Sequence, residues 1–168
     1  MKCHECRSEM SLVYNMDHYH CAGCNVYEFP SFDGSASDTI QPLGNTTDFF
    51  CPCCPEINLE VGQILGAQVC FCPNCRGYVI DTGTLGSLIS SLRASYTGPD
   101  DQPAMMNQEE LNVTTSCPAC LEPMQTHPYH GPGTVILDSC MNCKLSWLGH
   151  GELNKIVKAP GVRKMQSY

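Results

Sequence analysis

Apolar residues recur at helical spacing in two places along the chain. In the first place four of them stand at positions i, i+3, i+4 and i+7, which form one face of a helix: Leu85, Leu88, Ile89 and Leu92. In the second place three residues repeat that spacing: Leu153, Ile156 and Val157. Asp81 or Thr82 precedes the first stretch and can cap its N-terminus. We therefore expect one short amphipathic helix in each place.

The apolar pattern before each helix is typical of short strands. Three stretches combine β-forming residues with turn-forming residues near their middle, and each predicts a hairpin: residues 10–21, 57–72 and 127–140. The tip of the first hairpin is expected at 15–17. Residues 78–80 and 146–148 predict a third short strand in front of each helix. After residue 24 the chain contains Pro30 and shows no helical spacing, so the first unit is expected to have no helix.

Cysteines accompany every one of these stretches, and twelve of the fourteen form pairs separated by two residues. The pairs combine into three sets: Cys3, Cys6, Cys21 and Cys24; Cys51, Cys54, Cys72 and Cys75; Cys117, Cys120, Cys140 and Cys143. A pair with this spacing forms a tight turn with both sulfurs on one side, so two facing pairs supply the four corners of a tetrahedron. That geometry suits Zn²⁺ and leaves no open position for water or substrate. The sequence therefore predicts three structural zinc ions.

The cysteine sets divide the chain into three small units joined by polar segments. The expected organisation is unit 1 at 1–30, a linker at 31–48, unit 2 with its helix at 49–95, an acidic linker at 96–115, unit 3 with its helix at 116–158, and a tail at 159–168. Neither linker shows sustained periodicity, although residues 107–111 can form one helical turn. Units of this size bury too little apolar surface to fold unaided, so each is expected to depend on its metal.

Units 2 and 3 share a further motif around their cysteines. In unit 3 the elements are Cys117-Pro118-x-Cys120, Cys140-x2-Cys143, Trp147-Leu148 and Gly151-Glu152-Leu153. In unit 2 they are Cys72-Pro73-x-Cys75-x-Gly77, Val79-Ile80-Asp81 and Gly83-x-Leu85. With these motifs both units resemble the transcription-factor-IIB-type zinc ribbon, while unit 1 resembles it only in its cysteines. Gly149 stands where that family has aspartate, and Thr84 stands where it has glutamate.

The resemblance implies a fold class and a cofactor, and it implies no single activity. The expected fold is a small metal-stabilised α+β structure of three tandem zinc ribbons, the first one divergent. Each ribbon is a β-hairpin with a third strand, and a short helix follows in units 2 and 3. The metal is structural Zn²⁺ held by cysteines. Such ribbons serve as contact modules for DNA, RNA and proteins alike, so function must be argued from the individual chain.

Composition and charge narrow the choice of compartment and partner. The 168 residues carry a formal net charge of −8, which three four-thiolate zinc sites would take to roughly −14. Lysine and arginine are few and dispersed, which disfavours a surface that follows a phosphate backbone. The N-terminus has no apolar run typical of a secretory signal, and we expect a cytoplasmic, reducing environment without a membrane span. There, paired cysteines bind metal more often than they form a disulfide framework.

Several residues fall outside the three sets and leave alternatives open. Cys53 and Cys70 can replace neighbouring ligands, form a redox pair, or remain inert thiols. Two histidine pairs, His18 with His20 and His127 with His130, can bind a second metal or lie on hairpin surfaces. Iron in a rubredoxin-like site would use the same four thiolates and make the protein an electron carrier.

The leading functional prediction is a non-enzymatic adaptor that contacts another protein. Closed metal sites and the absence of a nucleophile–base pattern or phosphate-binding loop support this reading. Tyr78, Trp147 and Leu148 are expected on exposed strand edges, although Trp147 can equally fill the core of its own unit. The alternatives are a transcription-linked protein that binds nucleic acid, and a redox or metal-handling protein that uses Cys53, Cys70 or iron.

Overall fold

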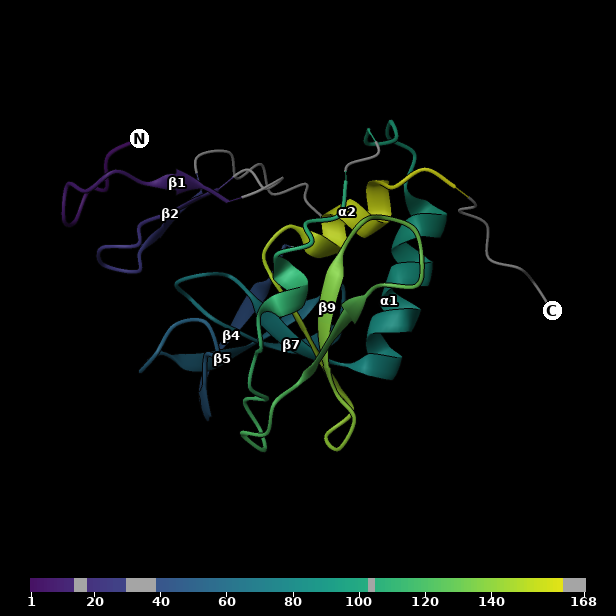
Figure 1. Cartoon of the computed structure of the whole chain (residues 1–168). Helices are drawn as coiled ribbons and strands as arrows, with labels where there is room; N and C mark the ends of the chain where they lie inside the picture. The colour runs from purple at the N-terminus through teal and green to yellow at the C-terminus, as the bar shows by residue number, and fades with distance from the viewer. Residues whose placement is uncertain (14–17, 30–38, 103–104, 162–168) are drawn as a thin grey trace.

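The computed structural model describes residues 1–13, 18–29, 39–102 and 105–161. In this part of the chain one seven-stranded sheet and one three-stranded sheet account for the strands. The predicted hairpin tip at 15–17 and most of the predicted tail lie outside the described residues. Figure 1 shows the large sheet at the centre with two helices against it, and the small N-terminal sheet at one side.

Ribbon 2, residues 49–95, supplies three strands of the large sheet and the longer helix. Its elements are β5 (Asn58–Ile64), β6 (Ala67–Phe71), β7 (Tyr78–Asp81) and α1 (Thr82–Ser95). The β5–β6 turn holds Leu65 at φ 47° and Gly66 at φ 83°. The carboxylate of Asp81 accepts a 2.8 Å hydrogen bond from the backbone N–H of Thr84, so Asp81 caps α1 as the sequence predicts.

Ribbon 3, residues 116–158, repeats the layout with a shorter helix. Its elements are β8 (Gln125–Pro128), β9 (Ile136–Cys140), β10 (Leu145–Leu148) and α2 (Glu152–Lys158). The N-cap of α2 is Gly151 at φ 87°, which has no side chain to offer as a cap. Instead, the carboxylate of Glu152 accepts a 2.8 Å bond from the backbone N–H of Gly149. Glu152 thus satisfies the backbone N–H of Gly149, the residue that stands where the resemblance leads us to expect aspartate.

Ribbons 2 and 3 join edge to edge in one continuous sheet. The order of the strands is β4-β5-β6-β7-β10-β9-β8, where β4 (Gln41–Phe50) is the first edge. β7 pairs antiparallel with β10, and Val79 lies opposite Trp147. Each of these two residues stands four positions after the last cysteine of its ribbon. Equivalent positions therefore face each other, and a local two-fold axis passes between Val79 and Trp147.

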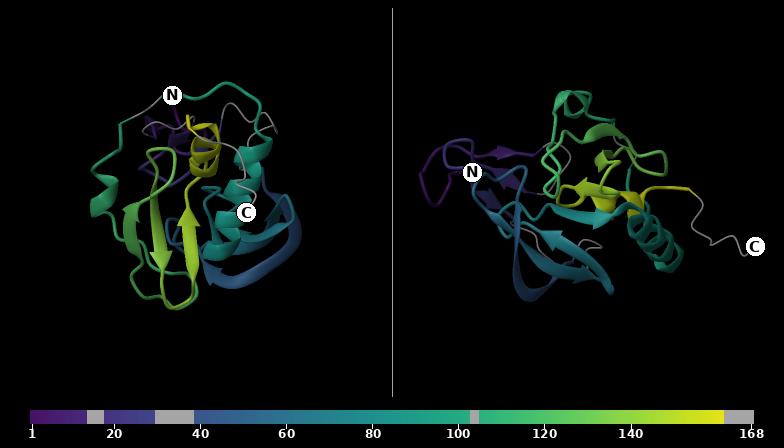
Figure 2. Two further views of the ribbon diagram at one scale, coloured as in Figure 1. Left: turned by 90° about the vertical axis from the view of Figure 1, so that its right-hand side faces the viewer. Right: turned by 90° about the horizontal axis from the view of Figure 1, so that it is seen from below.

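The pairing of β7 with β10 buries residues that the sequence places on exposed edges. Tyr78 and Leu148 are 0 % exposed and Trp147 is 5 % exposed. On the helix side of the sheet, Tyr78 and Leu148 join a core closed by α1 and α2, which Figure 2 shows on the same side of the sheet. On the opposite side, Trp147 packs among cysteines of both ribbons. The expectation of exposed edges is therefore wrong for Tyr78 and Leu148, while Trp147 fills a core, which is the alternative that the sequence leaves open.

Arg93 ties the two helices together from within the core. It is 5 % exposed, and its guanidinium donates to the carbonyl oxygens of Ile156, Val157 and Ala159 at 2.5, 3.4 and 3.0 Å. These carbonyls belong to the last turn of α2 and the residue that follows it, where the partial negative charge of the helix is concentrated. A cation of α1 thus caps the C-terminus of α2.

Strand β4 forms where the sequence analysis expects the end of a linker. It pairs with β5 at one edge of the sheet, and its register shifts twice between Pro42 and Phe50. All of its residues are exposed except Thr47, which is half-buried. Because pairing through the backbone holds this strand, its side chains carry no alternating pattern that the sequence could reveal.

Ribbon 1, described for residues 1–13 and 18–29, forms the small sheet. Its strands are β1 (Ser11–Leu12), β2 (Tyr19–His20) and β3 (Tyr27–Glu28). The segment between ribbons 2 and 3 contains one 3₁₀ turn, Glu110–Asn112, close to the predicted helical turn. Within the described residues, no helix is long and apolar enough to cross a membrane. The predicted fold class, a small α+β structure with three sites of four cysteines, is confirmed.

Candidate metal centres and the junction between them

The structure brings the twelve paired cysteines together in three groups of four. Cluster 1 is Cys3, Cys6, Cys21 and Cys24; cluster 2 is Cys51, Cys54, Cys72 and Cys75; cluster 3 is Cys117, Cys120, Cys140 and Cys143. Within each group all four Sγ atoms lie within 4.8 Å of one another. Each cluster combines two pairs from the two ends of a hairpin, which is the arrangement that the spacing predicts.

The sulfur positions fit zinc. The Sγ–Sγ distances across the clusters are 3.5 Å for Cys3–Cys24, 3.7 Å for Cys51–Cys75 and 3.6 Å for Cys120–Cys140. A tetrahedral ion with Zn–S bonds of about 2.3 Å separates its sulfurs by about 3.8 Å, whereas a disulfide requires about 2.05 Å. All fourteen cysteines are described, and all are free thiols. The three clusters therefore support three structural Zn²⁺ ions.

As a rule, a knuckle is closed by a residue in the left-handed region directly after its second cysteine. Five of the six knuckles follow this rule with non-glycine residues at φ between 55° and 64°: Arg7, Asn25, Arg76, Leu121 and Lys144. The sixth knuckle, Cys51 to Cys54, is followed by Pro55, whose ring excludes positive φ. There the left-handed residue is Glu56, at φ 67°, and the knuckle is one residue longer. The backbone N–H of Cys51 therefore donates to the carbonyl oxygen of Ile57, 2.8 Å away.

In each cluster, hydrogen bonds favour the thiolate form of at least one cysteine, while the pKa of a neighbouring thiol is raised, as it is for Cys24, Cys75 and Cys143. In cluster 3 the backbone N–H of Cys143 donates to Cys140 Sγ at 3.4 Å and lowers the pKa of Cys140 to about 7. In cluster 1 the hydroxyl and backbone N–H of Ser8 lower the pKa of Cys6 to about 6. In cluster 2 the neighbouring thiols, Cys51 first, hold the pKa of Cys72 far below its usual value.

The three clusters differ in how far they are shielded from water. All four cysteines of cluster 2 are buried, whereas clusters 1 and 3 each have only two buried cysteines. The other two are partly buried in cluster 3 and exposed in cluster 1. Asn74 adds to the shielding of cluster 2, because its side-chain N–H donates to Cys54 Sγ at 3.3 Å.

Trp147 separates clusters 2 and 3 and packs against the backbone of ribbon 2. It shares one core with cysteines of both clusters and with Val79 and Leu59. A Cβ atom placed on Gly77 would lie 2.5 Å from the Trp147 ring and 3.2 Å from the carbonyl oxygen of Leu148. The glycine of the Cys75-x-Gly77 motif therefore leaves room for the indole of the neighbouring ribbon.

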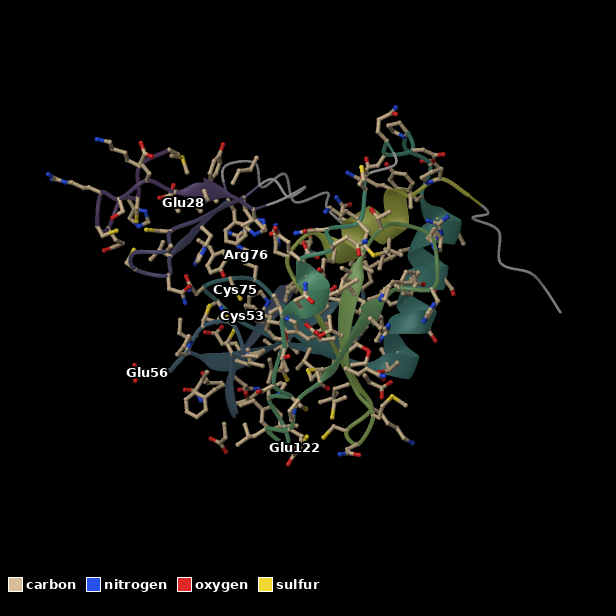
Figure 3. All side chains as sticks on the ribbon, viewed as in Figure 1. Glu28, Cys53, Glu56, Cys75, Arg76 and Glu122 are labelled. Atoms are coloured by element: carbon tan, nitrogen blue, oxygen red, sulfur yellow. The ribbon has the colours of Figure 1, made fainter. Side chains whose placement is uncertain are left out.

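Ribbon 1 docks on the second knuckle of ribbon 2. Arg76 lies over the ring of Phe29, with 4.0 Å from its guanidinium carbon to the ring centroid. Asn74 donates a side-chain hydrogen bond to Asn25 O at 2.9 Å. Figure 3 shows Arg76 between the small sheet and Cys75, with Glu28 on the side of ribbon 1. The three ribbons are thus in contact, a point that the sequence leaves open.

A cluster of aromatic rings and histidines extends this contact to ribbon 3. The ring of His150, just before α2, lies 4.7 Å from that of Phe29 and 5.5 Å from that of His18, centroid to centroid. His18 is 4 % exposed. The sequence predicts His18 on a hairpin surface or at a second metal, whereas it is an interior residue of the junction.

The remaining candidates lie outside the metal clusters. Cys53 is exposed on the knuckle of cluster 2, and Cys70 is half-buried on β6, where burial raises its pKa. Neither belongs to a group of four sulfurs. His127 bonds to Ser139 Oγ at 2.9 Å and stacks on His130 at 5.9 Å between centroids. Among the described residues, neither histidine pair belongs to a metal-binding group.

Comparison with known families identifies one ribbon directly. Residues 116–159 match the family of the transcription-factor-IIB-type zinc ribbon, described as a transcription factor zinc-finger. No curated protein and no solved structure matches the chain. The matched segment contains cluster 3, its hairpin, β10 and α2. Residues 116–159 are therefore a zinc ribbon of the transcription-factor-IIB type, and the three four-cysteine clusters are consistent with a chain of tandem zinc ribbons.

Proposed function

We propose that this chain is a non-enzymatic adaptor, held together by structural zinc, that binds an extended basic segment of another protein along the free edge of β4. The observation that carries the proposal is this long, exposed and acidic strand edge. The metal centres support it, because four thiolates close the coordination sphere of zinc and leave no position for a substrate.

The β4 edge has the features of a strand that accepts a partner strand. β4 is ten residues long, and among the residues that the structure describes it pairs with β5 on one side only. Leu43 is 49 % exposed and Phe50 is 53 % exposed. A long exposed edge with apolar side chains is unusual in a protein that does not use it, since free backbone N–H and C=O groups invite pairing.

The charge around this edge favours a basic partner. Residues 8–75 contain no lysine or arginine. Asp48 lies on β4 itself, Glu60 lies on the neighbouring β5 opposite Thr46, and Glu56 follows the first knuckle of ribbon 2. A segment with alternating basic and apolar residues would therefore pair with the backbone of β4, cover Leu43 and Phe50, and meet these carboxylates.

Quantitative capture of partners from the protein's own cell extract tests the proposal. Leu43→Asp and Phe50→Asp add charge to exposed positions of β4, and Leu65→Asp is the matched control because Leu65 is 78 % exposed at the β5–β6 turn. We expect one partner to be lost with both β4 variants and retained with the control. That partner, purified, should bind more weakly as salt is raised. Partners that bind all three variants equally would contradict the β4 assignment.

The family match favours a second candidate, binding to nucleic acid. The basic residues of ribbon 3 that could contact phosphate are Lys144, Lys155 and Lys158, and Lys144 is exposed. The net charge of −8 opposes it, because phosphate binding needs clustered cations. A steep fall of DNA or RNA affinity with salt, sensitive to Lys144→Gln, would favour this candidate over the adaptor.

A further inference from the structure

All three ribbons and the segment before ribbon 3 surround a cavity of about 270 Å³ on the side of the sheet that faces away from the helices. Its lining includes Trp147 and Asp138 from ribbon 3, Tyr27 from ribbon 1, and Glu110 and Val113 from the segment between ribbons 2 and 3. We call it the junction cavity. We propose that it binds an organic cation, with a guanidinium group as the best fit.

The first argument is the shape and lining of the cavity. Its walls are mainly apolar, with the rings of Trp147 and Tyr27 and the side chains of Val113 and Ile136. Val113 and Cys53 also line it and are exposed, so the cavity opens at the surface. Its volume lies just below the roughly 300–1,000 Å³ of sites for drug-sized ligands. A ligand of the size of one long side chain fits this space.

The second argument is uncompensated negative charge. Three carboxylates line the cavity, those of Asp138, Glu110 and Glu152. The basic side chains in the lining are the imidazoles of His18 and His150, and no lysine or arginine is among them. Asp138 accepts one hydrogen bond, from Thr126 Oγ1 at 2.5 Å, and Glu110 accepts one from Asn107 Nδ2 at 3.0 Å. Neither Asp138 nor Glu110 takes part in the ion pairs that His4 forms with Glu5 and Glu28. Each keeps one carboxylate oxygen for a ligand.

Carboxylates beside aromatic rings select for organic cations. A guanidinium is planar, stacks on an aromatic face and donates to carboxylates in a fixed fork, while an ammonium offers only point charge. A metal ion would instead need several ligand atoms close together. Among the described residues, only the twelve cysteines form such groups. An anion is disfavoured by Asp138 and Glu110. The lining therefore matches a guanidinium better than these alternatives.

This inference goes beyond the adaptor proposal and stands apart from it, because the cavity contains no residue of β4. The cation can be a free metabolite or an arginine side chain of a bound protein, and both offer the same chemistry. Agmatine, a free guanidinium compound, and a blocked arginine amide, which imitates an arginine residue, distinguish these sources. A urea analogue of agmatine has the same shape without the charge and serves as the control ligand.

The tryptophan of the cavity supplies the measurement. Trp147 is the only tryptophan of the chain, so fluorescence of the zinc-loaded protein reports on this site. The indole N–H signal in ¹H–¹⁵N spectra gives a second readout. We expect saturable changes with agmatine or the arginine amide, and at least tenfold weaker binding of the urea analogue. A preference for agmatine indicates a free metabolite, and similar affinity for the amide indicates a protein side chain.

Variants with matched charge changes decide the assignment. Asp138→Asn and Glu110→Gln should each weaken guanidinium binding at least tenfold while zinc content and the circular dichroism spectrum stay unchanged. Glu122→Gln is the control, since Glu122 is exposed outside the cavity and lies far from Cys53 in Figure 3. Equal binding of agmatine and its urea analogue, no response of either readout at millimolar ligand, or equal losses with Glu122→Gln would overturn the proposal. Leu43→Asp should leave this binding intact, so the two proposals can fail separately.

Discussion

Ribbon 1 and ribbon 2 bind metal with the same knuckles, yet they keep water away from it in different ways. Cluster 2 has four buried cysteines, and its ribbon continues into the seven-stranded sheet and α1. Cluster 1 has two exposed cysteines, and its strands are two residues long. The core of ribbon 1 consists of Cys3, Met10 and Cys21 with a few partly buried neighbours. Zinc thus replaces a core in ribbon 1 and adds to an existing core in ribbon 2.

Removal of one ligand should give the largest difference between the two ribbons. Cys72→Ser opens cluster 2 at the centre of the large sheet, so we expect loss of two-state unfolding for ribbons 2 and 3 together. Structural zinc contributes about 10 kcal/mol in small domains, which is more than a protein of this size can spare. Cys3→Ser should unfold ribbon 1 alone. Native mass spectrometry and ¹H–¹⁵N spectra measure both effects.

If Cys72→Ser and Cys3→Ser had the same effect, ribbons 1 and 2 would not differ in how they depend on zinc. In particular, two zinc ions and intact signals for residues 39–161 in Cys3→Ser are the expected signs of independence. A Cys3→Ser protein that loses the large sheet would show that ribbon 1 stabilises the whole molecule.

Arg93 tests whether the two helices form one folded unit. Arg93→Met keeps the length and the apolar stem but removes the donors to the α2 carbonyls, so three buried acceptors lose their partner. We expect a loss of about 2–4 kcal/mol in the free energy of unfolding, measured by urea denaturation. Arg93→Lys should recover part of this loss. If Arg93→Met unfolds α2 but leaves ribbon 2 native, the two ribbons are less coupled than their shared core indicates.

Gly77 tests how closely ribbons 2 and 3 pack at the two-fold axis between them. Gly77→Ala places a methyl group against the Trp147 ring and the Leu148 carbonyl, and we expect a loss of about 1–3 kcal/mol. Trp147→Phe in the same chain should relieve part of it. Gly86 is the control, because a Cβ atom there meets nothing within 4 Å, and Gly86→Ala in α1 should stabilise by about 0.5–1 kcal/mol. Thermal denaturation ranks the variants, and equal losses for both alanine variants would contradict the packing argument.

Local patterns predict the knuckles, hairpins and helices, while the contacts between ribbons escape them. The apolar spacing from Leu85 to Leu92 predicts α1, and the cysteine pairs predict the metal clusters, because each of these signals lies within one short stretch. Strand β4 could not be predicted, because it is held by backbone hydrogen bonds and its side chains are mostly exposed to water. The pairing of β7 with β10 could not be predicted, because neither strand contains a local pattern that identifies the strand beside it. Arg93 offers a usable signal: it stands four residues after Ile89 on the apolar face of α1, where a charge requires a buried partner.

The docking of ribbon 1 should respond to a smaller change. Phe29→Leu keeps an apolar side chain but removes the ring under Arg76 and beside His150. A cation–π contact of this kind contributes about 0.5–2 kcal/mol, so ribbon 1 should spend more time detached while its zinc remains bound. Relaxation measurements would then show faster tumbling of residues 1–29 than of residues 39–161. Unchanged relaxation would mean that the Asn74–Asn25 bond and the histidine rings hold ribbon 1 by themselves.

The smallest expected effect distinguishes the caps of α1 and α2. Asp81→Ala removes the side-chain cap of α1, and we expect Tm to fall by about 2–4 °C. Hydrogen bonds from Thr84 lower the pKa of Asp81, so its contribution is present above the pKa of the unfolded chain and is lost as pH falls through the lower folded value. The Tm difference between wild type and Asp81→Ala should therefore shrink on acidification, whereas Asp81→Asn, which keeps a cap, should stay close to wild type. Gly151, the N-cap of α2, has no side chain, so α2 has no equivalent of the Asp81 cap, and the carboxylate of Glu152 accepts from the N–H of Gly149 instead. A Tm difference that stays constant down to acidic pH would show that the charge of Asp81 is irrelevant and that hydrogen-bond geometry alone carries the cap.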